Sequence, residues 1–429
     1  MASAGDSGPA RPQDNITEAH VKAALTADKG SEADLVSWSV KDFTDKGDNY
    51  ATIVSSVNVK FSLAGQEQTT SYVIKLKPQM APGDVIAVFF TSIFKKEAEF
   101  FQEILPLLNA ELTTRGLCCL RMAKWFNTSL EKDKEMIFLE DLRSRGFKMF
   151  DRKKGMDVAH ATLVLQELAR LHAASLLLKA TAPEQDLADR FTHIKVDWKN
   201  FPENVKKHFN DMFSTYLVCS RELLHNMEGY EVAEQWLARH MNNSMDLVLR
   251  LLARNPKFDV ICHGDSWANN VLFRYSEDGV PAEVMLLDLQ MNRVASPATD
   301  LNSLLYSSLQ GNDKVKWRDF LSSYYDTFRG VMEAGGRDMP FTLEELHQEY
   351  RDKMEYGIIL GSIFLTVLLG EREDAPDVIN MKKEDMPDVL EVTRQVTSKM
   401  MENNPDFRSR FLALFGDLIH REPRCPSIV

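Results

Sequence analysis

The stretch "CHGDSWANNVLF", residues 262 to 273, crowds hydrogen-bonding side chains between apolar residues. Its flanks, "VI" before it and "VLF" at its end, have the apolar character of buried strands. A further apolar run, "EVMLLDLQ" at 283 to 290, carries another acid. We therefore expect strands joined as a β-hairpin that presents Asp265, Asn270 and Asp288 to one cleft.

These three side chains together suit phosphoryl transfer. Asn and Asp oxygens fit Mg²⁺, which takes few protein ligands and leaves room for phosphate oxygens. A neighbouring carboxylate that is not a ligand can accept a proton from an alcohol. Asp265, Asn270 five residues later and a distant Asp288 match the way phosphotransferases separate the base from the metal ligands. Taken singly, a polar turn or a hydrogen-bonded core acid explains each residue as well.

Two further residues favour the catalytic interpretation. Lys75 and Lys77 share one face of the strand "YVIKLKP", and Lys75 is the more central because Pro78 ends the strand. Glu97 interrupts the apolar face of a helix predicted over residues 87–109, so its carboxylate needs a partner. A solvated lysine is the alternative for Lys75. A pair of Lys75 with Glu97 is the arrangement that holds ATP phosphates in kinases.

Composition excludes several classes of protein. Apolar residues make up 44% and charged residues 27% of the 429, and the net charge of −12 argues against a nucleic-acid surface. The five cysteines form no CxxC pattern, which disfavours a disulfide framework or a zinc site. The N-terminus lacks the apolar core of a secretory signal, and the uncharged run 356–370 is short for a membrane span. We expect a cytoplasmic protein that binds neither membranes nor nucleic acid.

The chain divides into a sheet-rich part and a helical part. Residues 1–16 are expected to be disordered, and residues 16–30 to begin the fold as a short helix. Strands are predicted at 50–63 and 69–78, with 64–68 as their turn, and at 118–127 and 134–142 after the helix 87–109. Beyond a boundary near 142–147, long helices are predicted near 203–228, 231–254, 314–335, 343–370 and 388–418.

Taken together, seven motifs resemble the ecdysteroid kinase-like family. This family belongs to the aminoglycoside/choline-kinase-like branch of the protein kinase fold. The motifs are "GDNYATIV", "YVIKLKP", "FKKEAEFFQEILP", "IFLEDLRSRGFKMFDRKKG", "LARLHAAS", "CHGDSWANNVLF" and "LLDLQMNRVASPATDL". The resemblance covers roughly residues 35 to 420. It implies an α+β, bilobal fold, with a small antiparallel sheet and one helix in an N-lobe at 17–142 and a mainly helical C-lobe at 143–429.

The resemblance assigns ATP contacts to the N-lobe. Lys75 would bind the α- and β-phosphates and Glu97 would hold it in place. Residues 139–142, with Glu140 and Leu142, would form the adenine hinge, mostly through their backbone. Gly47 in "DKGDNYATIV" would cover the phosphates, although a single glycine is equally typical of a turn before a strand.

The resemblance assigns the chemistry to the C-lobe. Asp265 would be the catalytic base and His263 would orient its loop. Asn270 and Asp288 would hold Mg²⁺. Asp300 would brace the catalytic loop, unless it only complements the start of its own helix.

Three other side chains carry expectations of their own. His172, on an apolar helix face, is expected to be a hydrogen-bonded core histidine. Trp267 fits either a substrate platform or packing of the loop. Leu289 stands where many family members have Phe and is expected to be a harmless change.

Neither the composition nor the spacing of residues identifies the molecule that would accept the phosphoryl group. The resemblance implies a small-molecule alcohol, such as an ecdysteroid or a lipophilic xenobiotic. A catalytically silent binding protein and a choline- or aminoglycoside-type kinase are the alternatives, the latter with acidic stretches at 371–377 and 382–388. Gly357 and Gly361 either open an acceptor pocket along helix 356–370 or allow tight helix packing. The C-terminal "SIV" matches motifs that dock by strand addition, a match common by chance.

Overall fold

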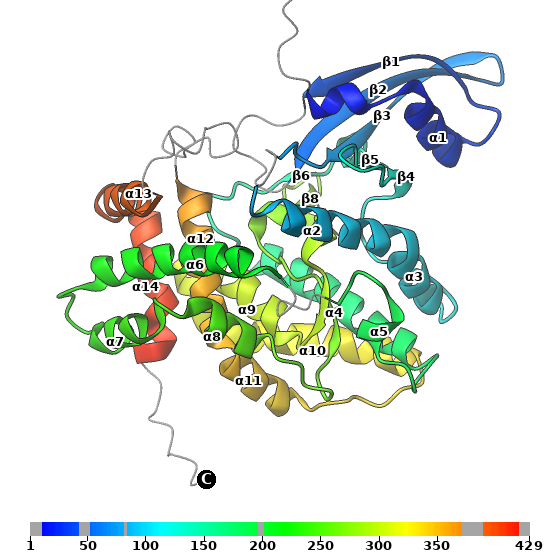
Figure 1. The fold of residues 1–429 in the computed structure, drawn as a ribbon. Helices are drawn as coiled ribbons and strands as arrows, with labels where there is room; N and C mark the ends of the chain where they lie inside the picture. Colours follow the sequence, from blue (N-terminus) through cyan, green and yellow to red (C-terminus); the bar gives the residue numbers. More distant parts are fainter. Residues whose placement is uncertain (1–10, 43–51, 81–83, 196–200, 371–388, 420–429) are drawn as a thin grey trace, which may run out of the picture.

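The computed structural model describes residues 11–42, 52–80, 84–195, 201–370 and 389–419. It shows an α+β fold of two lobes, with an antiparallel sheet at one end and a large helical body at the other, which confirms the predicted fold class (Figure 1). Gly47, the acidic stretches at 371–377 and 382–388, and the C-terminal "SIV" lie outside the described residues.

The N-lobe sheet has five antiparallel strands in the order β1-β2-β3-β5-β4. The predicted five-residue turn is too long, because only Ala64 and Gly65, both at positive φ, separate β2 from β3. β1 was not predicted; it is a half-exposed edge strand with a bulge, so its apolar alternation is weak. The strands are β1 (Asp34–Asp42), β2 (Ile53–Leu63), β3 (Gln66–Leu76), β4 (Trp125–Ser129) and β5 (Met136–Glu140).

The predicted disordered N-terminus extends too far. Pro12–Asn15 form a 3-10 turn, and the side chain of Ile16 is buried in the core of the sheet. The helix α1 (Glu18–Lys29) follows and buries Val21 and Leu25 in the same core. Burial of these apolar side chains orders the segment despite its polar start.

The helix predicted over residues 87–109 is present and lies between β3 and β4 along the chain. α2 (Ala87–Glu99) continues through a π-helical turn, Phe100–Ile104, into α3 (Leu105–Thr113). The buried apolar side chains of this helix from Phe94 onward belong to the large core of the C-lobe, which also includes Ile137 and Leu139 of β5. The other face of the sheet forms a separate core with α1. This helix therefore links the two lobes.

The C-lobe surrounds α4 with helices, and several of the long predicted segments are broken into two. The 343–370 segment divides at Lys353, and Pro405 begins a new helix within 388–418. The helices are α4 (Val158–Lys179), α5 (Leu187–Arg190), α6 (Glu203–Leu224), α7 (Glu231–His240), α8 (Ser244–Leu251), α9 (Ala298–Ser307), α10 (Trp317–Ala334), α11 (Leu343–Asp352), α12 (Met354–Leu369), α13 (Val389–Asn403) and α14 (Pro405–Ile419).

α4 is long and apolar enough to cross a membrane by length and composition. However, 72% of its most apolar window is buried inside the protein. Its neighbours include α10 and α3, and most of its side chains lie in the core of the C-lobe. This burial is typical of the central helix of a globular domain.

Short strands in the C-lobe hold the loops that carry the polar motifs. β8 (Val271–Tyr275) and β9 (Pro281–Leu286) form a hairpin, to which β6 (Lys148–Met149) adds a third strand. β7 (Val260–Cys262) pairs instead with β10 (Arg293–Ala295). The predicted hairpin is thus present, but Asp265 follows a strand of a different, two-stranded sheet.

Candidate active site

The predicted pair between β3 and α2 is present. Lys75 Nζ donates to Glu97 Oε2 at 2.6 Å, and both side chains are almost fully buried. Burying two charges is costly unless they are paired. Burial by itself would lower the pKa of Lys75, but the carboxylates of Asp288 and Glu97 outweigh it and raise this pKa above its ordinary value.

Asp288 joins this pair from the C-lobe. Its Oδ1 accepts a second hydrogen bond from Lys75 Nζ at 2.9 Å, and its Oδ2 accepts one from Gln290 Nε2 at 3.2 Å. Asp288 has a left-handed backbone, with φ 63°, which starts the 3-10 turn Leu289–Met291. The Leu289 N–H in that turn donates to the second oxygen of Glu97. Sequence reasoning missed both contacts, because a span of about 190 to 210 residues separates their partners.

The loop after β7 places Asp265 beside Asn270. Asn270 Nδ2 donates to Asp265 Oδ2 at 2.8 Å and to the Asp265 carbonyl at 2.9 Å. Gly264 precedes them at φ 86°, and any Cβ there would lie 1.9 Å from the Met291 carbonyl oxygen. Only glycine fits this crossing of the two loops, so Gly264 fixes how closely Asp265 approaches the Asp288 turn.

Burial raises the pKa of Asp265 to about 7, and the nearby negative charge of Asp288 adds to the effect. A carboxylate with a pKa near the working pH is well matched to general base catalysis. A cation bound beside Asp288 would offset that negative charge and lower the pKa of Asp265.

His263 is fully buried and positions the loop through hydrogen bonds. Its Nε2 donates to the Leu287 carbonyl at 2.9 Å, and its Nδ1 accepts from the Asp265 N–H at 3.3 Å. Burial lowers its pKa, in agreement with a neutral ring that uses both nitrogens in this way.

Asp300, in the first turn of α9, holds the backbone of the loop that carries His263, Gly264 and Asp265. Its Oδ2 accepts from the His263 N–H at 2.7 Å and its Oδ1 from the Gly264 N–H at 2.9 Å. His172 Nε2 lies 3.0 Å from Oδ2, and Tyr324 Oη lies 2.8 Å from His172 Nδ1. The expectation for His172 as a hydrogen-bonded core histidine is confirmed. Burial alone would raise the pKa of Asp300, but the hydrogen bond from His172 and neighbouring positive charge lower it to about 2.

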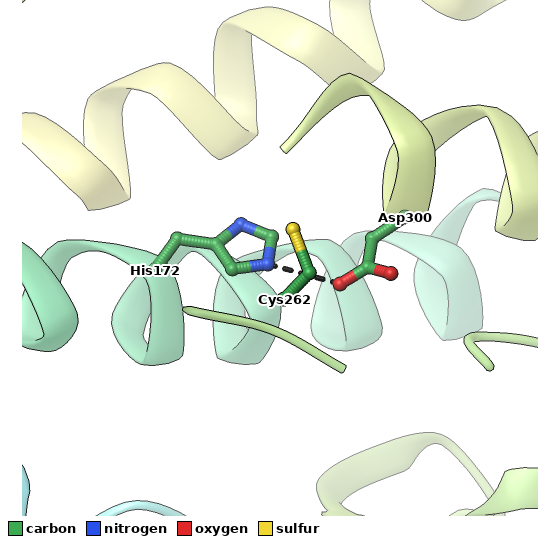
Figure 2. Close-up of side chains that lie close together, drawn as sticks. All are labelled: His172, Cys262 and Asp300. Carbon is green, nitrogen blue, oxygen red and sulfur yellow. Dashed lines mark hydrogen bonds and ion pairs between the residues drawn. The ribbon is translucent and has the colours of Figure 1, made fainter. Parts of the chain in front are cut away.

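The cluster of His172, Cys262 and Asp300 has the residue types of a metal site (Figure 2). Its potential ligand atoms lie within 4.8 Å of one another, and all three residues are buried. However, the His172 and Asp300 atoms already have hydrogen-bond partners, and burial raises the pKa of the Cys262 thiol well above its ordinary value. These contacts indicate a structural brace.

Residues 139–142, the predicted adenine hinge, lie at the end of β5 and the start of the 3-10 turn that follows it. Glu140 pairs with Tyr72 of β3, and Leu142 is buried at the start of a short 3-10 turn. Asp141 between them fixes the shape of this segment by accepting hydrogen bonds from Ser71 and from Arg143. Sequence reasoning assigned no role to Asp141. Adenine binding by this segment stays a prediction.

The two glycines of α12 do not line a pocket. A Cβ at Gly357 would lie 2.6 Å from the Tyr306 ring, and one at Gly361 would lie 2.6 Å from a methyl carbon of Leu414. The glycines serve close packing against α9 and α14, so the structure favours tight helix packing over the alternative of an acceptor pocket at these glycines. Phe364 of the same helix instead stacks on Trp267, with ring centroids 4.3 Å apart and planes 16° apart.

The two lobes, the buried pair of Lys75 with Glu97, and the contact of Lys75 with Asp288 that joins the lobes define a kinase-like protein. A family model described as "Ecdysteroid kinase-like family" matches residues 46–334. That match covers more than half of the chain, and the protein belongs to this family.

Comparison with solved structures gives matches of low identity. An ethanolamine kinase from Plasmodium vivax is 13% identical, with 89% of this chain and 84% of that chain covered and a TM-score of 0.39. The protein in a streptomycin–ATP–APH(2")-IIa ternary complex is 14% identical, with 83% and 98% covered and a TM-score of 0.30. Comparison with curated protein sequences finds no match.

Proposed function

We propose that this protein is an ATP- and Mg²⁺-dependent kinase that transfers a phosphoryl group to a hydroxyl of a small molecule. The proposal rests on the two hydrogen bonds that Lys75 Nζ donates, one to Glu97 and one to Asp288. The family match supports it. A lysine held in this way from both lobes is suited to binding phosphate oxygens, since its charge and position are fixed before the nucleotide arrives.

Asp288 and Asn270 fit a magnesium ion. The Asp288 side chain is 23% exposed, so its carboxylate is accessible to solvent. Asn270 directs its NH₂ group to Asp265, which leaves its carbonyl oxygen to face another partner. Oxygen donors of this kind suit Mg²⁺, which when bound would offset the charge on the phosphate groups.

Asp265 is the proposed acceptor of the hydroxyl proton. Asn270 fixes its carboxylate by the hydrogen bond to Oδ2, and the loop backbone is held by Asp300. The base therefore needs little reorganisation when the acceptor hydroxyl approaches.

For the acceptor, we propose a neutral, lipophilic alcohol of the ecdysteroid type. Phe364 is only partly buried where it stacks on the buried ring of Trp267, so it offers apolar surface beside the loop, near Asp265. Arg293 is a positive side chain close enough to act on Asp265. A cationic acceptor such as choline or an aminoglycoside would meet this positive charge beside the base, which disfavours its binding.

The test is turnover of Mg²⁺–ATP with a panel of steroid, choline and aminoglycoside acceptors, with the phosphorylated product identified by mass spectrometry. We expect a steroid phosphate from the wild type and none from Asp288→Ala, which should remain folded. Phosphorylated choline or aminoglycoside instead would refute the proposed acceptor. Steroid binding without any ATP use would refute the kinase and favour the binding protein.

A further inference from the structure

Glu99 on α2 makes an unusual contact with the C-lobe. Its side chain accepts hydrogen bonds from three successive backbone N–H groups, those of Thr192 at 2.7 Å, His193 at 2.8 Å and Ile194 at 3.0 Å. The side chain is only 5% exposed. Successive N–H groups that converge on one carboxylate form a strong anion-binding arrangement.

The spacing of the two glutamates directs them to different lobes. Glu97 and Glu99 are two residues apart, which on an α-helix turns their side chains by about 200°. Glu97 therefore meets Lys75 of the N-lobe sheet, while Glu99 meets the segment 192–194 of the C-lobe. One helical turn of α2 thus connects the phosphate-binding lysine to the C-lobe.

Other contacts hold α2 in the same place. Phe89 packs edge-on against Phe209 of α6, with ring centroids 4.5 Å apart. The Lys96 carbonyl accepts a hydrogen bond from Asn292, beyond the Asp288 turn, at 3.4 Å. The π-helical turn Phe100–Ile104 begins directly after Glu99, and such turns often occur at functional positions because they change the direction of the side chains.

We infer that Glu99 is a positioning residue that fixes α2 to the C-lobe and so keeps Glu97 against Lys75. The inference rests on the proposed kinase function for its effect on nucleotide, but not for the contact itself. One face of the N-lobe sheet has a core of its own, while α2 shares a core with Ile137 and Leu139 of β5 and with many side chains of the C-lobe. The C-lobe supplies most of that core, so contacts with the C-lobe have the larger part in setting the position of α2. Loss of the Glu99 contact should therefore let the helix move away from Lys75 while the sheet stays folded.

The experiment compares Glu99→Ala and Glu99→Gln with the control Glu103→Ala. Glu103 is an exposed acid one helical turn further along, in the π-helical segment. Hydrogen–deuterium exchange at residues 192–194 and along α2 reports the contact directly. Calorimetric titration with Mg²⁺–ATP and steady-state kinetics report its effect on nucleotide.

We expect faster exchange at 192–194 in Glu99→Ala and weaker Mg²⁺–ATP binding by about tenfold or more, the scale for losing hydrogen bonds to a charged group. Glu99→Gln keeps one accepting oxygen and should fall between Glu99→Ala and the wild type, and Glu103→Ala should match the wild type. In a Glu97→Ala background, Glu99→Ala should add little to the loss of kcat/KM, since Glu99 acts through Glu97.

Three outcomes would overturn the inference. The first is unchanged exchange at 192–194 in Glu99→Ala. The second is faster exchange with normal Mg²⁺–ATP affinity. The third is fully additive losses for Glu97→Ala and Glu99→Ala, which would indicate a general effect on stability. If the wild type itself uses no ATP, the proposed function fails, and the exchange measurement still decides whether Glu99 fixes α2.

Discussion

Replacing Asp300 by Asn tests which of two roles Asp300 has. It either braces the loop that carries Asp265 or only complements the start of its own helix. Asn keeps the shape of the side chain but puts an NH₂ group in place of one oxygen. In either orientation, at least one donor from His263, Gly264 or His172 then faces another donor. A buried donor without a partner costs about 1–3 kcal/mol, and the remaining bonds lose their charge assistance, so we expect a total loss of about 2–4 kcal/mol.

The lowered pKa of Asp300 arises from the same contacts and indicates a stabilisation of similar size. A folded-state value of about 2 against an ordinary 3.8 corresponds to about 2 kcal/mol. Because the folded-state pKa is the lower one, this stabilisation is complete above pH 3.8. It is lost as the pH falls towards 2, where the folded state also takes up the proton. The wild type should therefore lose stability in this pH range more steeply than Asp300→Asn does.

The matched control is Asp319→Asn. Asp319 is also the third residue of its helix, α10, but its side chain is exposed. Complementing a helix start contributes only about 0.3–1 kcal/mol, so this variant should unfold almost like the wild type. The assay is urea denaturation followed by tryptophan fluorescence at pH 7, with kcat measured in parallel. Equal losses in Asp300→Asn and Asp319→Asn would refute the brace and leave Asp300 as a helix-start residue.

Three further predictions follow from the site and its packing. Asp265→Asn should lower kcat by about 10²-fold or more with ATP affinity kept, the scale of a general base. The pKa of about 7 applies without a bound cation, so the wild-type kcat/KM should rise with pH at values below 7 when Mg²⁺ is bound, and this rise should disappear in the variant. Normal turnover in that variant would make Asp265 structural. Lys75→Ala should lower kcat/KM for ATP more than Glu97→Ala does, and the two losses should be non-additive in the double variant. Additive losses would indicate that Lys75 and Glu97 act independently. Gly361→Leu should lower the melting temperature because of overpacking, whereas Gly330→Leu, with open space around it, should not. A normal melting temperature of Gly361→Leu together with lost turnover of the acceptor would instead favour an acceptor pocket at Gly361.

The local part of the site could be predicted from the sequence. Asp265, Asn270 and Asp288 lie on loops that adjoin short strands, and apolar runs mark those strands without reference to the rest of the chain. Glu97 was recognisable because a charge on an apolar helix face needs a partner, and Lys75 was the charged residue on the preceding strand. In both cases the signal is contained within about 25 residues.

Only the tertiary structure decided which of these groups meet across the lobes. Periodicity shows that a face is buried but does not show what covers it, so Gly357 and Gly361 could equally have faced a ligand or a helix. The partners of Asp288 and Glu99 lie about 90 to 210 residues away, and their distances depend on how two separately formed cores pack together. Such contacts are set by the docking of whole elements, because a hydrogen bond tolerates only a few tenths of an ångström and no local pattern fixes the position of a helix that precisely.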